Sequence, residues 1–233
     1  MKPHSSVEAD ATVAPEQDFW SALPPEDAAA LAACGAVRRF PRGETLMYQG
    51  QAPDRVMLLR SGRVRITFTT PHGRRVVLAV SGPGELVGEL AAFDDQPRSA
   101  TVAAIEPVEA LCIGHADFQA FLAGHPAAAL TLLRLMSRRL RDADVKLVEF
   151  AVVSTIGRVA ARLLELSERF GEPEGDTIRI ALPLTQEELA GWVGASLESV
   201  GRALKTMREL QWIDTGRRQF RILDERALRR AAG

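Results

Sequence analysis

Hydrophobic and polar residues alternate in short runs over the first half of the chain, and glycines separate the runs. These glycines recur between residues 43 and 114 at intervals close to the length of a strand plus a turn. Short strands at regular spacing with glycine corners are typical of a sandwich or a jelly-roll barrel. We therefore expect a β domain over residues 19–125, with a short helix beginning at Pro24-Pro25 and strands at 55–60, 64–68 and 74–80.

The period changes to that of a helix after residue 126. A seam at alternating spacings of four and three runs along it, through Leu133, Ser137, Leu140, Asp144, Leu147 and Ala151. Such a seam is typical of a helix that packs on a second copy, although a helix packed on its own barrel is the alternative. We predict a dimerisation helix over residues 126–152.

Asp144 is the polar exception on this seam. A carboxylate there costs several kcal/mol if it is desolvated and unpaired. Either the helices splay at that level, or a partner satisfies the carboxylate, or Asp144 lies at the rim beside Arg141.

The helical pattern continues past Val153 and ends at Phe170-Gly171. A turn over 172–176 and a strand over 177–182 are expected next. Pro and Gly in the first of these segments are the usual residues of a turn.

Two short helices joined by Gly194-Ala195 follow. Thr185 stands three residues before Glu188, as in a capping box, and Ser196 is placed to cap the second helix. Residues 212–222 have the pattern of a strand, a basic turn and a strand. A helix-turn-helix followed by such a hairpin predicts a winged helix-turn-helix over residues 153–233.

Charge is unevenly distributed along the chain. The net charge is −1, yet nine basic and five acidic residues lie from Ser196 onward, a local balance of +4. A basic C-terminal face fits contact with DNA phosphates, whereas an Arg-rich helix face is often merely solvated.

Glu198 and Arg202 lie four residues apart and therefore share one helix face. Arg bonds bidentately to guanine, and Glu accepts from cytosine N4. An ordinary intrahelical ion pair is the alternative. The candidate DNA-contacting residues are Thr185, Gln186, Ser196, Leu197, Glu198, Ser199, Arg202, Lys205, Arg217 and Arg218.

Several classes of function are disfavoured. No apolar run approaches the roughly 20 residues of a membrane helix, and residues 1–18 form a polar tail without the apolar core of a signal peptide, so a weakly ordered tail and a cytoplasmic location are expected. The two cysteines and four histidines have no metal-ligand spacing, so we expect no metal, iron–sulfur cluster or haem, and two small buried thiols. A cupin-like enzyme would need more histidines on the strands than His72 and His115.

Two segments, Gly88-Glu89-Leu90 through Pro97-Arg98-Ser99-Ala100-Thr101 and Gly194 through Arg202, resemble the cyclic-AMP receptor protein/FNR family of bacterial regulators. The resemblance extends over about residues 40–228. It implies an α+β protein with an N-terminal cyclic-nucleotide-binding jelly-roll β-barrel, a long dimerisation helix and a C-terminal winged helix-turn-helix. It also implies a non-enzymatic homodimer on pseudo-palindromic double-stranded DNA, with RNA polymerase as a partner if the protein is an activator.

The resemblance assigns roles in a nucleotide cassette. Arg98, Ser99 and backbone N–H groups would hold a cyclic phosphate. Glu89 would hold the ribose 2′-hydroxyl, and Arg139 would pair with Glu89. The implied cassette residues are Gly88, Glu89, Leu90, Arg98, Ser99 and Ala100.

Two positions depart from the family pattern. Ala143 and Asp144 stand where cyclic-AMP-responsive members carry Thr with Ser or Asn, and a carboxylate suits the two donors of guanine, so cAMP and cGMP are both candidate effectors. Leu197 replaces a base-reading Arg, which implies an altered outer half-site. A ligand-independent member with an empty effector pocket and a nucleotide-binding adaptor without DNA function remain alternatives.

Overall fold

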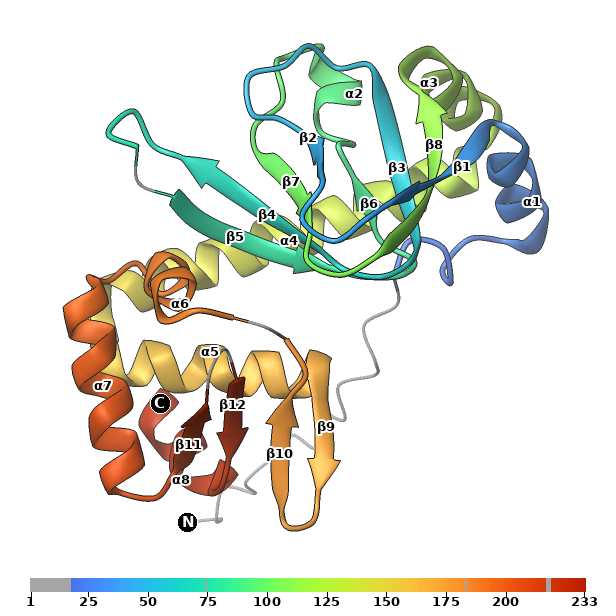
Figure 1. The fold of residues 1–233 in the computed structure, drawn as a ribbon. Coiled ribbons are helices and arrows are strands. Elements are labelled where there is room, and N and C mark those ends of the chain that lie inside the picture. The colour runs from blue at the N-terminus through green and yellow to red at the C-terminus, as the bar shows by residue number, and fades with distance from the viewer. Residues whose placement is uncertain (1–17, 74, 183, 217–218) are drawn as a thin grey trace, which may run out of the picture.

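The computed structural model describes residues 18–73, 75–182, 184–216 and 219–233, and shows a β domain and a helical C-terminal domain connected by one long helix (Figure 1). The tail predicted over 1–18 lies outside the described residues, except for Asp18. No helix in the described part of the chain is both long and apolar enough to cross a membrane.

The β domain contains two four-stranded antiparallel sheets, ordered β1-β8-β3-β6 and β2-β7-β4-β5. The strands predicted at 55–60, 64–68 and 74–80 are confirmed within a residue or two. The full set of strands is β1 (Gly35–Phe40), β2 (Thr45–Met47), β3 (Arg55–Ser61), β4 (Val64–Thr69), β5 (Arg75–Ser81), β6 (Leu86–Val87), β7 (Thr101–Ala104) and β8 (Val108–Gly114).

Side chains from both sheets meet in the centre of this domain, where Met57, Leu59, Val64 and Ala110 are at most 1% exposed. A second apolar cluster covers the outer face of the first sheet with helices α1 (Pro25–Ala33), α3 (His115–Gly124) and the start of the long helix. Successive residues of β3 are therefore buried on both faces of the sheet.

The long helix α4 spans Pro126–Val152, as its periodicity predicts. Ala128 and Leu132 anchor its first turns in the β domain. The seam then turns away from the rest of the chain, and Leu133, Leu140 and Leu147 are each 62–65% exposed. One chain alone thus leaves an apolar helix face uncovered.

The C-terminal domain combines helices with a four-stranded sheet ordered β11-β12-β10-β9. Its elements are α5 (Thr155–Phe170), β9 (Gly171–Glu174), β10 (Thr177–Ile180), α6 (Gln186–Trp192), α7 (Leu197–Glu209), β11 (Ile213–Gly216), β12 (Gln219–Ile222) and α8 (Glu225–Ala232). The predicted helix-turn-helix and the wing strands are both present.

Two expectations are corrected. The turn predicted over 172–176 is wrong, because β9 pairs antiparallel with β10 and the turn shrinks to Gly175 and Asp176. Gly175 has φ +61°, which makes so tight a turn accessible. The cysteines are free and half-buried rather than buried: Cys34 is the C-cap residue of α1, and Cys112 is one of the half-buried positions that alternate with buried ones on β8.

Candidate nucleotide cassette and DNA-reading helices

The candidate cassette begins where β6 ends. Gly88 has φ +81°, and a Cβ there would lie 2.6 Å from Arg98 Nη1 and 2.7 Å from the Met47 side chain. Only glycine fits this close approach. The chain then enters the short helix α2 (Ala91–Asp94) and returns past Arg98 into β7.

Arg98 is 4% exposed, and its guanidinium is held from three sides. Nη1 donates to the Gly88 carbonyl at 2.7 Å, and Nη2 donates to Asp54 Oδ1 at 3.1 Å and to the Arg55 carbonyl. Arg has five N–H donors, so donors remain for an anion. Ser99 beside it is exposed, and Ala100 is buried.

Asp54 is a cassette contact that the sequence did not reveal. Burial disfavours its charged form, but hydrogen bonds from Arg55 and Arg98 outweigh burial and lower the pKa of Asp54. An ionised carboxylate thus balances the buried guanidinium. No local motif signals this pairing, because 44 residues separate Asp54 from Arg98.

Glu89 is 4% exposed and forms the predicted ion pair with Arg139 of α4. Burial raises the pKa of Glu89, and the positive charge of Arg139 opposes the rise. Arg139 Nη2 also donates to the Leu86 carbonyl at 3.4 Å. These contacts tie the long helix to the cassette, whereas Leu90 at the start of α2 is 52% exposed.

Ala143 and Asp144 lie further along α4, and both are exposed. Ala143 is four residues from Arg139 and shares its helix face, whereas Asp144 is turned toward the exposed seam. Asp144 lines a groove of about 330 Å³ with Val145, Val148, Glu149, Val152 and Val153. A single chain therefore places Asp144 beside apolar residues of α4 and not among the described residues of the cassette.

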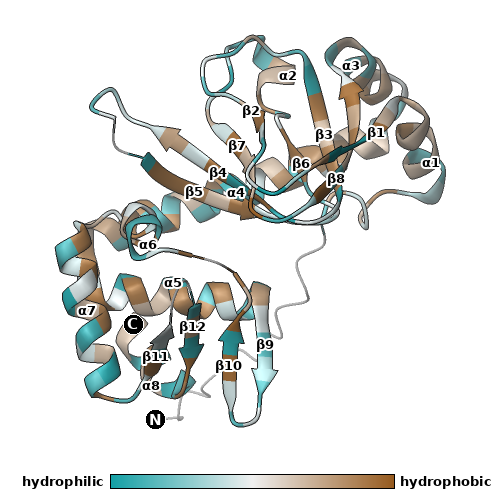
Figure 2. Ribbon diagram, viewed as in Figure 1, coloured by the Kyte–Doolittle hydropathy of each residue, from teal (hydrophilic) through white to brown (hydrophobic). Residues whose placement is uncertain are grey.

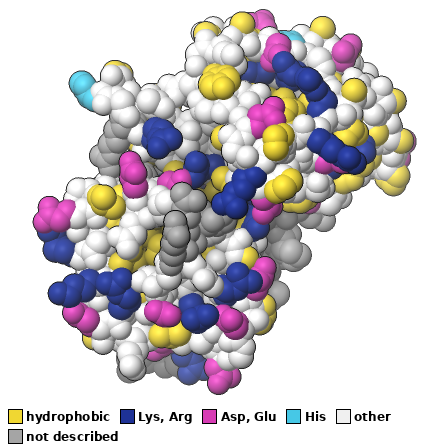
Figure 3. Space-filling model, in the orientation of Figure 1, with side chains coloured by type: hydrophobic (Ala, Val, Ile, Leu, Met, Phe, Trp, Pro, Cys, Tyr) yellow, Lys and Arg dark blue, Asp and Glu magenta, His cyan; other side chains and the backbone are white. Residues whose placement is uncertain are grey.

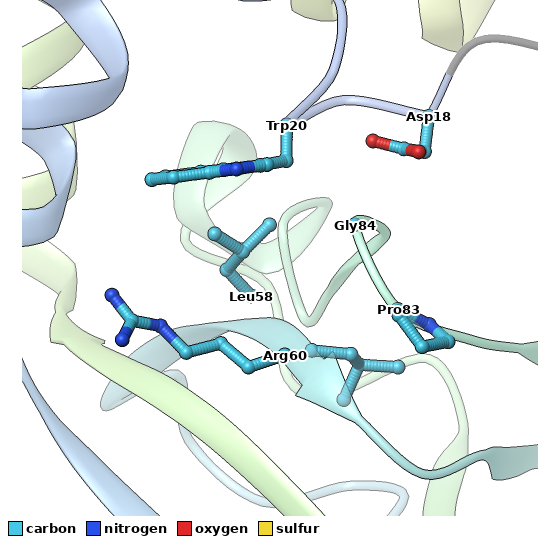
Figure 4. A pocket seen from close by; sticks show the side chains of 7 residues that line it. Asp18, Trp20, Leu58, Arg60, Pro83 and Gly84 are labelled. Atoms are coloured by element: carbon cyan, nitrogen blue, oxygen red, sulfur yellow. The ribbon is translucent and has the colours of Figure 1, made fainter.

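A separate hollow of about 420 Å³ lies between the Trp20 indole and β3, on the outer side of the first sheet (Figure 4). Its lining comprises Asp18, Trp20, Leu58, Leu59, Arg60, Pro83 and Gly84. None of the predicted cassette residues is in that lining, so this hollow is distinct from the candidate nucleotide site.

The capping box at the start of α6 is confirmed. Thr185 Oγ1 accepts from the Glu188 N–H at 3.1 Å, and Glu188 Oε2 accepts from the Thr185 N–H at 2.8 Å. Gly194, with φ +64°, makes the turn, and a Cβ there would meet the Phe150 ring of α4 at 2.8 Å. Gln186 is exposed and Thr185 half-buried at the N-terminus of α6.

Helix α7 presents its polar face outward. Ser196 Oγ caps it by accepting from the Ser199 N–H at 3.1 Å, and Val200, Leu204 and Met207 are buried beneath it. Leu197, Glu198, Arg202 and Lys205 are exposed on the outer side. Figure 3 shows Lys and Arg side chains over α7 and the strands beside it, with acidic side chains among them.

Glu198 and Arg202 form the i,i+4 ion pair that was the alternative to base contacts, with side chains 80% and 65% exposed. Arg202 Nη2 also donates to Ser199 Oγ at 3.2 Å. So exposed a pair contributes little stability. Arg217 and Arg218 of the wing turn lie outside the described residues.

A β domain with a buried arginine beside a glycine loop, joined by a long helix to a winged helix-turn-helix, is the architecture of a transcription regulator with a cyclic-nucleotide-binding domain. The family model of the cyclic nucleotide-binding domain matches residues 37–125, and that of the Crp-like helix-turn-helix domain matches residues 157–231. The chain belongs to the CRP/FNR family of transcription regulators, which are not enzymes.

A curated relative is the CRP-like cAMP-activated global transcriptional regulator of Mycobacterium tuberculosis, 37% identical over 193 residues, or 83% of this chain and 86% of the relative. The crystal structure of Thermus thermophilus catabolite activator protein is 31% identical, with a TM-score of 0.53 over 92% of this chain and 97% of that chain. The c-di-GMP responsive regulator CLP of Xanthomonas campestris shares the fold at 23% identity, with a TM-score of 0.75 over 85% of this chain and 99% of that chain.

Proposed function

We propose that this protein is a cytoplasmic homodimer that binds a pseudo-palindromic operator under the control of a cyclic nucleotide. The observation that carries the proposal is the buried Arg98, held against Gly88 near the buried Glu89, which pairs with Arg139. The Mycobacterium tuberculosis relative, named as cAMP-activated, supports the same conclusion. RNA polymerase is a further partner if the protein is an activator.

The cassette offers each part of a cyclic nucleotide a chemical partner. Arg98, Ser99 and backbone N–H groups of the loop around Gly88 and Ala100 suit the phosphate. The Glu89 carboxylate suits the ribose 2′-hydroxyl. Because Glu89 also contacts Arg139, a nucleotide bound there would act on α4 directly.

The second copy of the chain is expected on the exposed face of α4. A seam in which three leucines are 62–65% exposed is costly in water and is covered when two such helices pair. Asp144 faces that seam, so it would approach a nucleotide base only in the assembled dimer.

Asp144 bears on whether the protein prefers cAMP or cGMP. A carboxylate can accept from both N1–H and the 2-amino group of guanine, but only from the 6-amino group of adenine. We propose that Asp144 shifts preference toward cGMP relative to family members with Ser or Asn. Calorimetric titration of both nucleotides tests this: tighter cAMP binding that Asp144→Ala leaves unchanged would refute it.

The proposed operator retains an inner G·C pair read by Arg202 and Glu198, with Thr185, Gln186, Ser196, Ser199, Lys205, Arg217 and Arg218 contributing further DNA contacts. Leu197 cannot donate to a guanine, so the outer position of the half-site is altered. Selection of binding sites from random DNA tests this proposal. Recovery of half-sites that require a G at the outer position as strictly as at the inner position would contradict it.

A ligand-independent regulator is the second candidate, and one observation favours it. Asp54 and two backbone carbonyls accept hydrogen bonds from Arg98, so protein groups alone compensate its charge. Calorimetry distinguishes the two, since a ligand-independent protein would bind operator DNA but neither nucleotide. A nucleotide-binding adaptor would show the reverse.

A further inference from the structure

The helix-turn-helix has a second attachment to the β domain besides the covalent connection through α4. Helix α6 lies against β5 in Figure 1, and Val77 and Val80 of β5 share one apolar cluster with Leu189 and Trp192 of α6. All four side chains are at most 4% exposed. β5 is also one of the more hydrophobic strands in Figure 2. We call this contact the α6–β5 interface.

An ion pair flanks the apolar part of this interface. Arg65 of β4 donates to Glu188 Oε1, and both side chains are less than a quarter exposed. The other oxygen of the same carboxylate, Oε2, accepts from the Thr185 N–H at 2.8 Å and completes the capping box. One carboxylate therefore fixes the N-terminus of α6 and joins it to the β domain.

Gly191 is the point at which the backbone of α6 comes close to that of β5. A Cβ at this position would lie 2.9 Å from the Arg75 carbonyl oxygen and 3.5 Å from both Val76 Cα and Val77 N, which are all backbone atoms of β5. Gly in a helix interior costs about 1 kcal/mol relative to Ala. The glycine thus permits a close approach of two backbones.

The interface is one strand away from the cassette. β7 begins at Thr101, directly after Arg98, Ser99 and Ala100, and pairs antiparallel with β4. In this register Arg65 lies opposite Ala103. A change at Arg98 therefore has a short route through β7 and β4 to Glu188.

We propose that the α6–β5 interface is a regulatory contact, which holds the helix-turn-helix against the β domain and carries the state of the cassette to α6 through β7 and β4. The first part, that the interface holds the helix-turn-helix against the β domain, is argued from the contacts alone. The second part rests on the proposed function.

Three variants are chosen to weaken the α6–β5 interface while leaving the fold of each domain intact. Gly191→Ala improves helix propensity and places a methyl group against the β5 backbone. Glu188→Gln removes the charge yet keeps a side chain suited to a capping box. Arg65→Gln breaks the pair from the other side, and Arg179→Gln, which opens the exposed Arg179–Glu172 pair within the C-terminal domain, is the matched control.

Hydrogen exchange of the full nucleotide-free protein tests the first part. Each of the three variants should raise amide exchange roughly three- to tenfold in both α6 and β5, the two sides of a local opening, whereas Arg179→Gln should not. Glu188→Gln combined with Arg65→Gln should exceed neither single change. Unchanged exchange in Gly191→Ala and Glu188→Gln would overturn the proposal.

DNA affinity measured with and without cAMP or cGMP tests the second part. The factor by which a nucleotide changes DNA affinity should be smaller in Gly191→Ala and Glu188→Gln than in the parent and the control. An equal factor in all proteins would overturn the transmission route. A parent that binds no nucleotide would refute the proposed function instead, and the exchange experiment would still decide the first part.

Discussion

Arg98 shows how a charged side chain is held inside a small domain. Buried arginines are rare unless paired, because desolvating the charge costs several kcal/mol. Asp54 and the carbonyls of Gly88 and Arg55 supply that pairing. The guanidinium is consequently fixed before a ligand arrives, and a phosphate would meet donors that need little reordering.

Arg98→Lys should weaken nucleotide binding. A lysine keeps the charge but loses the planar fork, and hydrogen bonds to charged groups contribute about 1.5–3 kcal/mol, or roughly ten- to a hundredfold in affinity. Isothermal titration calorimetry measures the effect. Unchanged affinity in a folded variant would show that Arg98 does not contact the ligand.

Glu89→Gln should alter the pH dependence of stability. Burial raises the pKa of Glu89 above its ordinary value of 4.5, with Arg139 opposing. An acid with a raised folded-state pKa binds more protons in the folded than in the unfolded state, so it lowers stability as pH rises through that interval. Gln does not titrate, so the Glu89→Gln variant does not lose stability in this way as pH rises.

Urea unfolding from pH 4.5 to neutral pH checks the sign. The unfolding free energy of Glu89→Gln should rise relative to that of the parent over this range. A constant difference, or one that moves in the parent's favour, would contradict the assigned effect of burial.

At the scale of elements, α4 has two different halves. Its first turns pack in the β domain, while Leu133, Leu140 and Leu147 remain exposed. Leu140→Glu should abolish dimerisation, because a symmetric interface loses two buried leucines worth about 1.5–3 kcal/mol each. Sedimentation velocity should show a monomer for this variant. Asp142→Lys, off the seam on the same helix, should remain dimeric; a dimeric Leu140→Glu would contradict the seam.

Substitutions on helix α7 should distinguish side chains that read bases from side chains that contact phosphates. Arg202→Ala should cost about 1–3 kcal/mol of discrimination at one base pair, whereas Lys205→Ala should weaken all sequences alike and reduce the salt dependence. Fluorescence anisotropy with matched and mismatched operators distinguishes them. Equal losses on both DNAs for Arg202→Ala would contradict a base-reading role.

The sequence predicted elements well where local chemistry determines them. Periodicity placed α4, and the capping pattern of Thr185 and Glu188 placed α6. The strand β9 was missed because Pro173 and Gly175 are turn residues by propensity, and only pairing with β10 makes the segment extended. The roles of Asp54 and Arg65 were equally hidden, since each depends on a residue distant in sequence and leaves no local pattern.

At the scale of the whole molecule, two domains meet through α4 and again through the α6–β5 interface. The cassette touches α4 through Glu89 and Arg139, and β7 lies beside β4, which carries Arg65. A ligand that favours one arrangement of these parts changes DNA affinity only by its difference in affinity for the two arrangements. Coupling factors of about 5–150-fold are typical of such proteins.

The most direct test of nucleotide control is the affinity of the full-length protein for its selected operator, measured by fluorescence anisotropy without nucleotide, with cAMP and with cGMP. We predict that at least one nucleotide tightens DNA binding about fivefold or more, and that Arg98→Lys shifts this effect to much higher nucleotide concentration. Operator affinity that is identical with and without either nucleotide would contradict control through the cassette.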